Sequence, residues 1–506
     1  MQNSTRIISN TGILYVKMGI TVFVSLYSVR LVLATLGAVD YGIFNVLMGV
    51  ITMLSFLNAA MSVSSQRFLS YYQGKNAKDK LCMVYNLSVT MHILLGLVLC
   101  LSLALLAKYI VFDFLQIPKE RLSVSLIIFY SMAVSVFFTI LSVPYTALIN
   151  SNEKMICIAV VTIIESLLKL AVAISLQFVA CDKLLFYGIS MGLISFISLM
   201  EYFFICKYSF QEAKFVPFRK LDWKLGRQMM NFIGWNLVGS ITAISKNQGV
   251  AILFNVQRGP AVNAAYAIAN QVSGQLNFFS ATLLRAINPQ IMKKEGSGNH
   301  QGMIEMSLLT CKYSFLLLLF FSIPCIFQMK TILALWLKSV PQYSVYFCML
   351  ILVAILCDQL TVGINSAFQA ANFVKQSAIY VGFIKLLIIP LGLFFLYFGY
   401  SVYAVVIGYA LVELFAGIVR LKLANKYFDL TARHYYNVVL KKIIMPIVCC
   451  AIICLLCNLF PNRLVQLLMS LSLSSLVFVI IAYRFSLNEA ERLILRNLVN
   501  KLLKRK

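Results

Sequence analysis

Fourteen apolar runs, each long enough to cross a lipid bilayer as an α-helix, recur along this chain of 506 residues. A bilayer core needs about 20 residues of helix, because a spanning segment must satisfy its own backbone hydrogen bonds. The runs fall near 11–36, 42–65, 84–107, 122–146, 155–178, 184–206, 228–253, 262–285, 305–328, 343–366, 376–397, 400–420, 439–459 and 464–484. The chain is 61% apolar and only 12% charged, which excludes a soluble fold of this length. The sequence therefore predicts an all-α polytopic membrane protein with about 14 transmembrane helices.

Lysine and arginine are distributed unevenly over the segments that connect these runs. If the N-terminus is cytoplasmic, 29 of the 43 cations fall on inner segments and 8 on outer segments. This bias obeys the positive-inside rule, so we expect both termini in the cytoplasm. Most of the net charge of +26 then reflects topology, and we expect no nucleic-acid partner. We expect residues 487–506 to form an amphipathic basic helix on anionic membrane lipids.

Two long basic inner loops, 207–227 and 420–442, divide the runs into six, six and two. We expect an N-lobe over 1–206, a C-lobe over 228–423, and two further helices with their preceding loop over 424–486. Transporters built from paired bundles carry their substrate between the bundles. The prediction is therefore two six-helix lobes around a central cavity, plus two C-terminal helices. A weak internal sequence repeat agrees with the division into two lobes, since LGAVDYGIF after the first run resembles RGPAVNAAYAI after the seventh.

The seventh and eighth runs are unusually rich in polar side chains. Their candidate cavity residues are Asn236, Lys246, Asn247 and Gln248 in the seventh run, and Asn263, Asn270, Gln271 and Asn277 in the eighth. The three asparagines of the eighth run are spaced by seven residues, so on a helix they share one face, which Asn288 rejoins. Amides exposed to lipid cost several kcal/mol, so this face must meet protein or water. We interpret it as the wall of a water-filled cavity; the alternative is that the amides join neighbouring helices.

Basic side chains lie within or at the ends of the first, second, seventh and eighth runs. They are Lys17, Arg30, Arg67, Lys246 and Arg285. Charges inside a membrane are costly and by default suggest function, and a cationic wall at low dielectric suits an anionic substrate such as a phosphate. The alternatives are that Arg30 reaches the outer headgroups, and that Arg67 and Arg285 simply flank the inner membrane surface.

Two carboxylates, Asp358 and Glu413, lie within the tenth and twelfth runs. An isolated buried carboxylate can carry a proton or a sodium ion, so both are candidates for ion coupling. The alternative is pairing with a cation from another helix, such as Lys312 or Lys385.

Features of enzymes and metalloproteins are missing from the sequence. Its 13 cysteines and three histidines show no metal-ligand spacing, and no phosphate-binding P-loop is present. We therefore expect no metal site, no cofactor other than Na+ or H+ as a coupling ion, and no enzymatic activity.

Several stretches resemble bacterial polysaccharide flippases, the O-antigen and exopolysaccharide exporters of the multidrug/oligosaccharidyl-lipid/polysaccharide (MOP) superfamily. The stretches are SLYSVRLVL around Arg30, LGAVDYGI at 36–43, SQRFLS at 65–70, GWNLVGS at 234–240, KNQG at 246–249, GPAVNAAYAIANQV at 259–272 and INPQI at 287–291. Beyond about residue 300 the likeness rests mainly on the number of helices and on hydropathy.

The resemblance implies a transporter of the bacterial inner membrane. Its substrate would be an oligosaccharide linked to polyprenyl pyrophosphate, such as an O-antigen, capsule or exopolysaccharide repeat unit, moved from the inner to the outer leaflet by alternating access. Membrane lipids and the polysaccharide polymerase machinery are the implied partners. The family's cavity cations would correspond to Lys17, Arg30 and Lys246, with Arg67 and Arg285 as further members.

Two other functions fit the same composition. A multidrug antiporter of the same superfamily would be expected to favour acidic cavity residues, whereas the candidates here are mainly basic residues and amides. A membrane polysaccharide polymerase or ligase would need a sizeable outer loop for its catalytic groups, and the outer loops near 108–121 and 329–342 are short.

Overall fold

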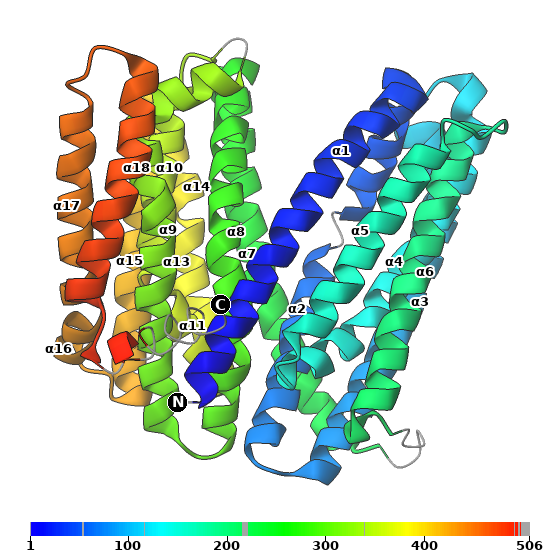
Figure 1. Cartoon of the computed structure of the whole chain (residues 1–506). Helices are drawn as coiled ribbons and strands as arrows, with labels where there is room; N and C mark the ends of the chain where they lie inside the picture. The colour runs from blue at the N-terminus through cyan, green and yellow to red at the C-terminus, as the bar shows by residue number, and fades with distance from the viewer. Residues whose placement is uncertain are drawn as a thin grey trace, which may run out of the picture. The chain divides into compact units, whose positions relative to one another are not determined.

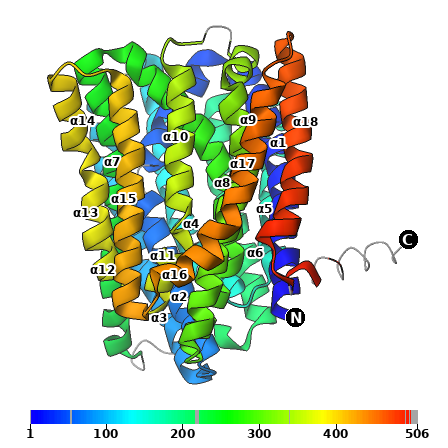
Figure 2. The same cartoon turned by 90° about the vertical axis from the view of Figure 1, so that its left-hand side faces the viewer.

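The computed structural model describes residues 2–52, 55–115, 117–214, 221–337, 340–489, 491–493 and 496, and every regular element among them is helical (Figures 1 and 2). These residues form two compact units. One unit comprises Ile8–Leu237, and the other comprises Val238–Lys506 with Met1–Ile7. Both boundaries between the units therefore fall within helices, one near the start of α1 (Gln2–Thr52) and one inside α7 (Trp223–Arg258).

The N-terminal unit is built around helix α4, which contacts α2, α3, α5 and α6. Its elements are α1 (Gln2–Thr52), α2 (Ser55–Gly74), α3 (Lys78–Lys108), η1 (Tyr109–Phe114), η2 (Lys119–Arg121), α4 (Leu122–Ser151), α5 (Met155–Ser175), α6 (Lys183–Ser209) and η3 (Gln211–Ala213). Gly188 lets α6 approach α4 closely, because a Cβ there would lie 2.8 Å from Ile128. The first turns of α7 also belong to this unit, since the Phe232 ring packs edge-on against Phe68 of α2 at 5.8 Å.

The C-terminal unit is built around helices α9 and α15. Its elements after α7 are α8 (Pro260–Gly296), α9 (His300–Trp336), α10 (Ser344–Gln359), α11 (Val362–Ala370), α12 (Val374–Gln376), η5 (Ser377–Val381), α13 (Gly382–Leu386), α14 (Ile388–Tyr397), α15 (Val402–Phe428), α16 (Ala432–Tyr435), η6 (Tyr436–Leu440), α17 (Lys441–Cys457), α18 (Arg463–Ile481) and η7 (Ala482–Ser486). Aromatic side chains pack together where α7, α8 and α10 meet. The ring centre of Phe254 lies 5.4 Å from that of Tyr266 and 5.3 Å from that of Phe347. Helix α9 contacts α8, α10, α11, α17 and α18.

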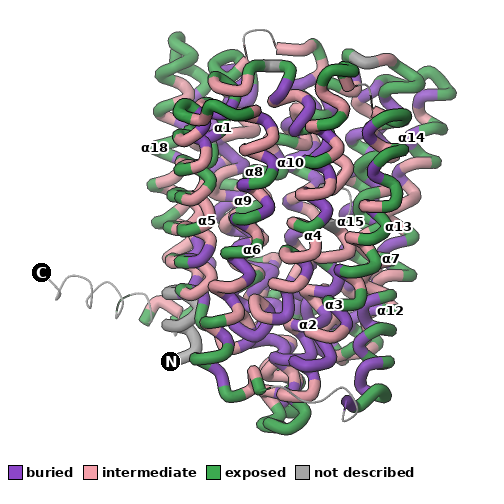
Figure 3. Tube along the Cα trace, turned by 90° about the vertical axis from the view of Figure 1, so that its right-hand side faces the viewer, coloured by how far each residue is buried: buried purple, intermediate pink, exposed green. Residues whose placement is uncertain are grey.

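The predicted fold class is confirmed. Twelve of the described helices are long and apolar enough to span a membrane, and there are thirteen such spans if the bent pair Val39–Ile51 and Phe56–Gly74 is counted as one. The remaining predicted run, 262–285, forms α8, whose amides make it less apolar. Buried and exposed residues alternate along single helices (Figure 3), as expected for helices packed on one side.

Most helices extend several residues beyond the predicted runs, because polar ends continue the helix outside the hydrocarbon. Helix α15 reaches Phe428, so the predicted loop 420–442 contains little non-helical chain. Helix α6 reaches Ser209 and α7 begins at Trp223, and residues 215–220 of the predicted loop 207–227 lie outside the described residues. Most of the predicted basic tail, 487–506, lies outside them as well.

Two glycines at equivalent places adopt the same rare backbone conformation. Gly37 has φ 78° and ψ 172° at the turn inside α1, and Gly259 has φ 87° and ψ 177° at the turn between α7 and α8. This region of the φ/ψ map is essentially restricted to glycine. The two residues are the glycines of the LGAVDYGIF and RGPAVNAAYAI stretches, so the internal sequence repeat reflects a repeated helical hairpin.

We expect Gly37→Ala and Gly259→Ala each to lower the free energy of unfolding by about 1–3 kcal/mol. No other atom lies within 4 Å of a Cβ at either position, so the loss comes from backbone strain alone. Gly274→Ala in α8 is the matched control, because its position is helical and equally open. That control should gain about 0.5–1 kcal/mol. Unfolding of the purified variants in detergent measures these changes, and a neutral result for both turn variants would contradict the assigned conformation.

Candidate functional site

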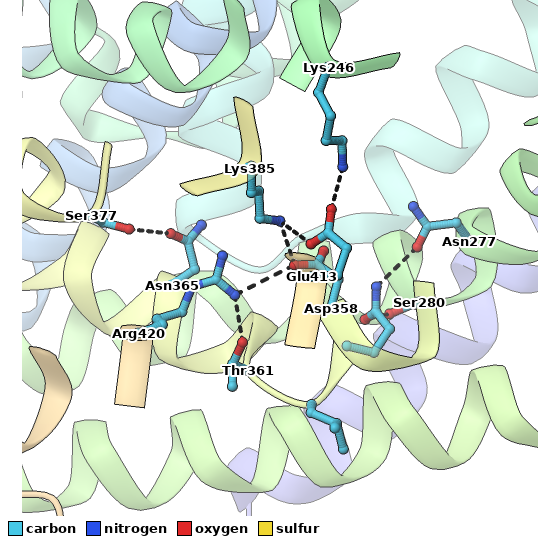
Figure 4. A network of polar contacts seen from close by, with 12 residues as sticks. Lys246, Asn277, Ser280, Asp358, Thr361, Asn365, Ser377, Lys385, Glu413 and Arg420 are labelled. Atoms are coloured by element: carbon cyan, nitrogen blue, oxygen red, sulfur yellow. Dashed lines mark hydrogen bonds and ion pairs between the residues drawn. The ribbon is translucent and has the colours of Figure 1, made fainter. Parts of the chain in front are cut away.

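Five charged side chains from four helices converge inside the C-terminal unit (Figure 4). Lys246 comes from α7, Asp358 from the end of α10, Lys385 from α13, and Glu413 and Arg420 from α15. Glu413 and Arg420 are seven residues apart, so they lie on the same face of α15. We call these five residues the charge network.

The carboxylates of the network alternate with its cations. Glu413 pairs with Lys246 through Oε1, and its Oε2 lies 2.8 Å from Nζ of Lys385. The same Nζ lies 2.8 Å from Oδ1 of Asp358. Arg420 completes the network, with Nη1 3.6 Å from Asp358 Oδ1.

The network is buried at one end and open at the other. The Glu413 side chain is 2% exposed, whereas the Asp358 side chain is 33% exposed. Three cations face two carboxylates, so one positive charge remains without a carboxylate inside the network. At low dielectric this residual charge attracts anions more strongly than it would in water.

The helix backbone is irregular on both sides of the network. Helix α10 ends at Gln359 and α11 begins at Val362. A side chain satisfies the backbone at this break, since Tyr435 donates its hydroxyl to the Leu360 carbonyl at 2.8 Å, and Arg420 also donates to the Thr361 side chain at Oγ1, 2.7 Å away. Broken helices with satisfied backbone groups are the usual setting of substrate and ion sites in transporters.

The span that carries Lys385 is irregular as well. It passes through the π-helical segment η5 into α13, turns at Leu387 and continues as α14. Pro390 has no backbone N–H, so it cannot bond to the carbonyl of residue 386, which accounts for the turn. Segments of π-helix often occur at functional sites.

The asparagine stripe of α8 divides into two parts. In the C-terminal half of α8, Asn277 Oδ1 accepts a hydrogen bond from Gln359 at 3.1 Å, and Asn288 Oδ1 accepts one from Ser366 at 2.8 Å. These two amides join α8 to α10 and α11, as the alternative interpretation of the stripe stated. Asn263 and Asn270 are half-buried, and the neighbouring Gln271 is exposed.

The amides of α7 also differ from one another. Asn247 and Gln248 are exposed, and Asn247 Oδ1 accepts a hydrogen bond from the Tyr409 hydroxyl at 3.0 Å. Asn236 donates to the backbone carbonyl of Phe232 within its own helix at 2.9 Å. Asn247, Gln248 and Gln271 are therefore accessible from outside their helices.

The remaining candidate cations have different environments. Lys17 is half-buried on α1, Arg30 is exposed on the same helix, and Arg285 is exposed on α8. Arg67 is buried, with its guanidinium carbon 4.5 Å from the Phe68 ring centre and 5.4 Å from that of Phe232. Arg67 is thus enclosed by aromatic rings.

No protein-family model and no curated protein matches this sequence. The comparison with solved structures does find similar folds. A MOP superfamily transporter from Pyrococcus furiosus, described as having a binding pocket of reversed polarity that suggests a different function, has a TM-score of 0.72 at 11% identity, covering 84% of this chain and 96% of its own. The outward-facing structure of a multidrug resistance MATE family transporter has a TM-score of 0.70 at 11% identity over the same shares. The MATE transporter ClbM in complex with Rb+ has a TM-score of 0.70 at 13% identity, covering 86% and 96%.

This chain has the fold of MOP superfamily transporters. It is a multi-pass membrane protein, and its structural neighbours are transporters rather than enzymes. Among the residues that the structure describes, no group of His, Cys, Asp and Glu side chains could hold a metal ion.

The sequence identified three members of the charge network as site candidates, named Lys385 as a possible partner for the carboxylates, and gave Arg420 no role. Asp358 is not isolated, because it pairs with Lys385, one of the two partners considered for it, and Glu413 is paired with two lysines. The other candidate partner, Lys312, pairs with a carboxylate outside the charge network. Arg420 was counted with the inner loop cations, but it is 6% exposed and belongs to the network. Its spacing of seven residues from Glu413 was the available clue.

Proposed function

We propose that this protein transports an anionic, sugar-bearing lipid, a polyprenyl-pyrophosphate-linked oligosaccharide, from the inner to the outer leaflet of the bacterial inner membrane. The observation that carries the proposal is the charge network, in which three cations face two carboxylates. A pyrophosphate requires cations, and Lys and Arg are the side chains that bind phosphates most strongly.

The exposed amides provide the second part of the recognition. Asn247, Gln248 and Gln271 each carry donors and an acceptor, which is the chemistry that pairs with sugar hydroxyls. Their exposed positions on membrane helices are incompatible with lipid, so they support a water-filled route. The polysaccharide flippase resemblance of the first, second, seventh and eighth helices supports the same substrate class.

The multidrug antiporter is the second candidate, because its fold is equally similar. Polarity of the pocket is the property that separates the two. The Pyrococcus furiosus transporter is described as differing in function because its binding pocket has reversed polarity. The positive balance of the charge network here favours an anionic substrate over a cationic drug.

Deletion of the gene, followed by analysis of lipid-linked oligosaccharides on each face of the inner membrane, tests the proposal. Accumulation on the cytoplasmic face, with loss of surface polysaccharide, is the expected result. Unchanged oligosaccharide distribution together with increased sensitivity to cationic drugs would instead establish the multidrug function. Accumulation on the outer face would indicate a polymerase or ligase.

We further propose that transport is coupled to a proton or sodium gradient through Asp358 and Glu413. Asp358 is the more exposed of the two carboxylates, and both of its cationic neighbours, Lys385 and Arg420, lie on other helices. Binding of a proton or a cation to Asp358 would release Arg420 toward an anionic substrate and would leave Lys385 with Glu413 as its remaining carboxylate partner. Ion binding and substrate binding would then be linked at one place.

Asp358→Asn is expected to remove most of the stimulation of transport by an imposed gradient. The charge network would then hold three cations against one carboxylate in all conditions, so substrate binding would no longer depend on the ion. Transport by proteoliposomes with and without a proton or sodium gradient measures this change. Asp358→Glu, which keeps the titratable group, is the control. If Asp358→Asn retained the gradient dependence of the wild type, Asp358 would have no role in coupling.

A further inference from the structure

The two C-terminal helices are fastened to α9 by polar contacts at both ends. Toward one end, Gln328 of α9 donates to Asn458 Oδ1 at 2.7 Å and to Ser470 Oγ at 3.0 Å. Toward the other end, Lys312 of α9 reaches the segment that follows α18. Apolar packing barely distinguishes a neighbouring helix from lipid, so polar contacts of this kind determine where the α17–α18 pair docks.

Lys312 is the most enclosed of these contacts. Its side chain is 1% exposed, and its Nζ lies 2.8 and 2.9 Å from the two carboxylate oxygens of Glu491. The Ser486 carbonyl accepts from the same Nζ at 3.3 Å, and the Tyr313 ring centre lies 4.7 Å away. A buried ammonium group is stable only with a counterion, and here the counterion comes from 179 residues later in the chain.

Glu491 has a second structural role at the start of the C-terminal tail. Its Oε2 accepts a hydrogen bond from the backbone N–H of Asn488 at 2.7 Å. A glutamate that accepts a hydrogen bond from the backbone N–H three residues before it makes one half of a capping box, an arrangement found where helices begin. The carboxylate that initiates the tail helix is thus the carboxylate that neutralises Lys312.

We infer that Glu491 occupies a phosphate site centred on Lys312, and that the phosphate of an anionic inner-leaflet lipid competes for this site and releases the start of the tail. The inference does not depend on the transported substrate. Under the predicted orientation the site lies at the cytoplasmic end of the C-terminal unit, where such lipids are available.

The chemistry of both partners supports this exchange. An ammonium group offers three donors, and it binds phosphate oxygens as readily as carboxylate oxygens. The Glu491 side chain is 16% exposed, so solvent and headgroups can reach its edge. The sequence after Glu491 contains six basic residues and no acidic residue, so an anionic membrane surface also attracts the released tail. An anionic lipid therefore provides a substitute for Glu491 and a second binding surface for the tail.

Amide hydrogen exchange across residues 486–493 tests the inference in the full-length protein. The protein is reconstituted into nanodiscs of phosphatidylcholine alone, or of phosphatidylcholine mixed with phosphatidylglycerol. Phosphatidylglycerol is expected to increase exchange of this segment about tenfold, equivalent to about 1.4 kcal/mol. Inorganic phosphate, added to phosphatidylcholine nanodiscs, distinguishes the source. An increase with it would show that the site accepts free phosphate as well as a headgroup.

Two variants separate the proposed site from general attraction of the tail. In Lys312→Gln the exchange rate should no longer depend on phosphatidylglycerol, because the competed cation is absent. In Glu491→Gln exchange should be fast in both lipids, and Lys312→Met in that background should recover the melting temperature that the single variant loses. If phosphatidylglycerol left wild-type exchange unchanged, or increased it equally in Lys312→Gln, Glu491 would be a permanent counterion and the inference would be wrong.

Discussion

Glu413→Gln is expected to lower the free energy of unfolding by about 3–5 kcal/mol, because it leaves a buried cation without its counterion. Glu413 is the shared partner of two lysines, Lys246 and Lys385. Lys385 retains Asp358 after the substitution, but within the charge network the other carboxylate, Asp358, pairs with Lys385 and Arg420 and not with Lys246. The cost therefore falls mainly on Lys246, whose side chain is 10% exposed.

Lys246→Met should be less damaging than Glu413→Gln. After that substitution Glu413 still has Lys385 at 2.8 Å, so no charge is left alone. The double variant Lys246→Met with Glu413→Leu replaces a buried ion pair by apolar side chains, a change that is often neutral for stability. It should recover most of the stability lost in Glu413→Gln but should not recover transport.

Chemical unfolding of the purified variants in mixed micelles gives the three free energies, and transport by proteoliposomes gives the activity. Equal losses of stability for Glu413→Gln and Lys246→Met would mean that Lys385 does not stabilise the Glu413 carboxylate when Lys246 is removed. Recovery of transport in the double variant would show that the pair serves only to stabilise the fold.

The membrane fold could be predicted from the sequence because its cause is local. Each apolar run is a continuous segment, and the need to satisfy the backbone in lipid converts it into a helix without reference to the rest of the chain. The internal sequence repeat at Gly37 and Gly259 was readable for the same reason. Both turns need a backbone conformation that only glycine adopts readily.

The charge network was only partly predictable because its contacts join helices distant in the sequence. Lys246 and Glu413 were each recognised as costly charges within a span, but they are separated by 167 positions in the sequence, and no pattern over that distance pairs them. Arg420 was assigned to the membrane surface because α15 extends beyond the apolar run that was used to define the span.

The asparagine stripe shows that periodicity predicts which residues share a helix face but not what that face contacts. Spacing of seven residues correctly places Asn263, Asn270 and Asn277 on one face of α8. What that face meets depends on other helices: α10 supplies Gln359 to Asn277, while Asn263 remains half-buried. A single stripe therefore contributes both to helix packing and to the exposed polar surface.

Arg30→Ala is expected to reduce transport by about one to two orders of magnitude while leaving the protein stable. A hydrogen bond to a charged group contributes about 1.5–3 kcal/mol, and each 1.4 kcal/mol is a factor of ten. Arg30 is exposed on α1, and the described part of the structure gives it no ion pair. Its removal therefore leaves no buried carboxylate unpaired, and the amount of protein in the membrane should not change.

Arg30→Lys separates the two interpretations of this residue. A lysine reaches the outer headgroups as well as an arginine does, so it would preserve a membrane anchor fully. It cannot reproduce the planar, two-pronged contact that a guanidinium makes with a phosphate. If Arg30 binds the pyrophosphate, Arg30→Lys should transport more slowly than the wild type and faster than Arg30→Ala, at equal protein levels. Wild-type transport by Arg30→Ala would remove Arg30 from the substrate site, and wild-type transport by Arg30→Lys alone would favour the anchor.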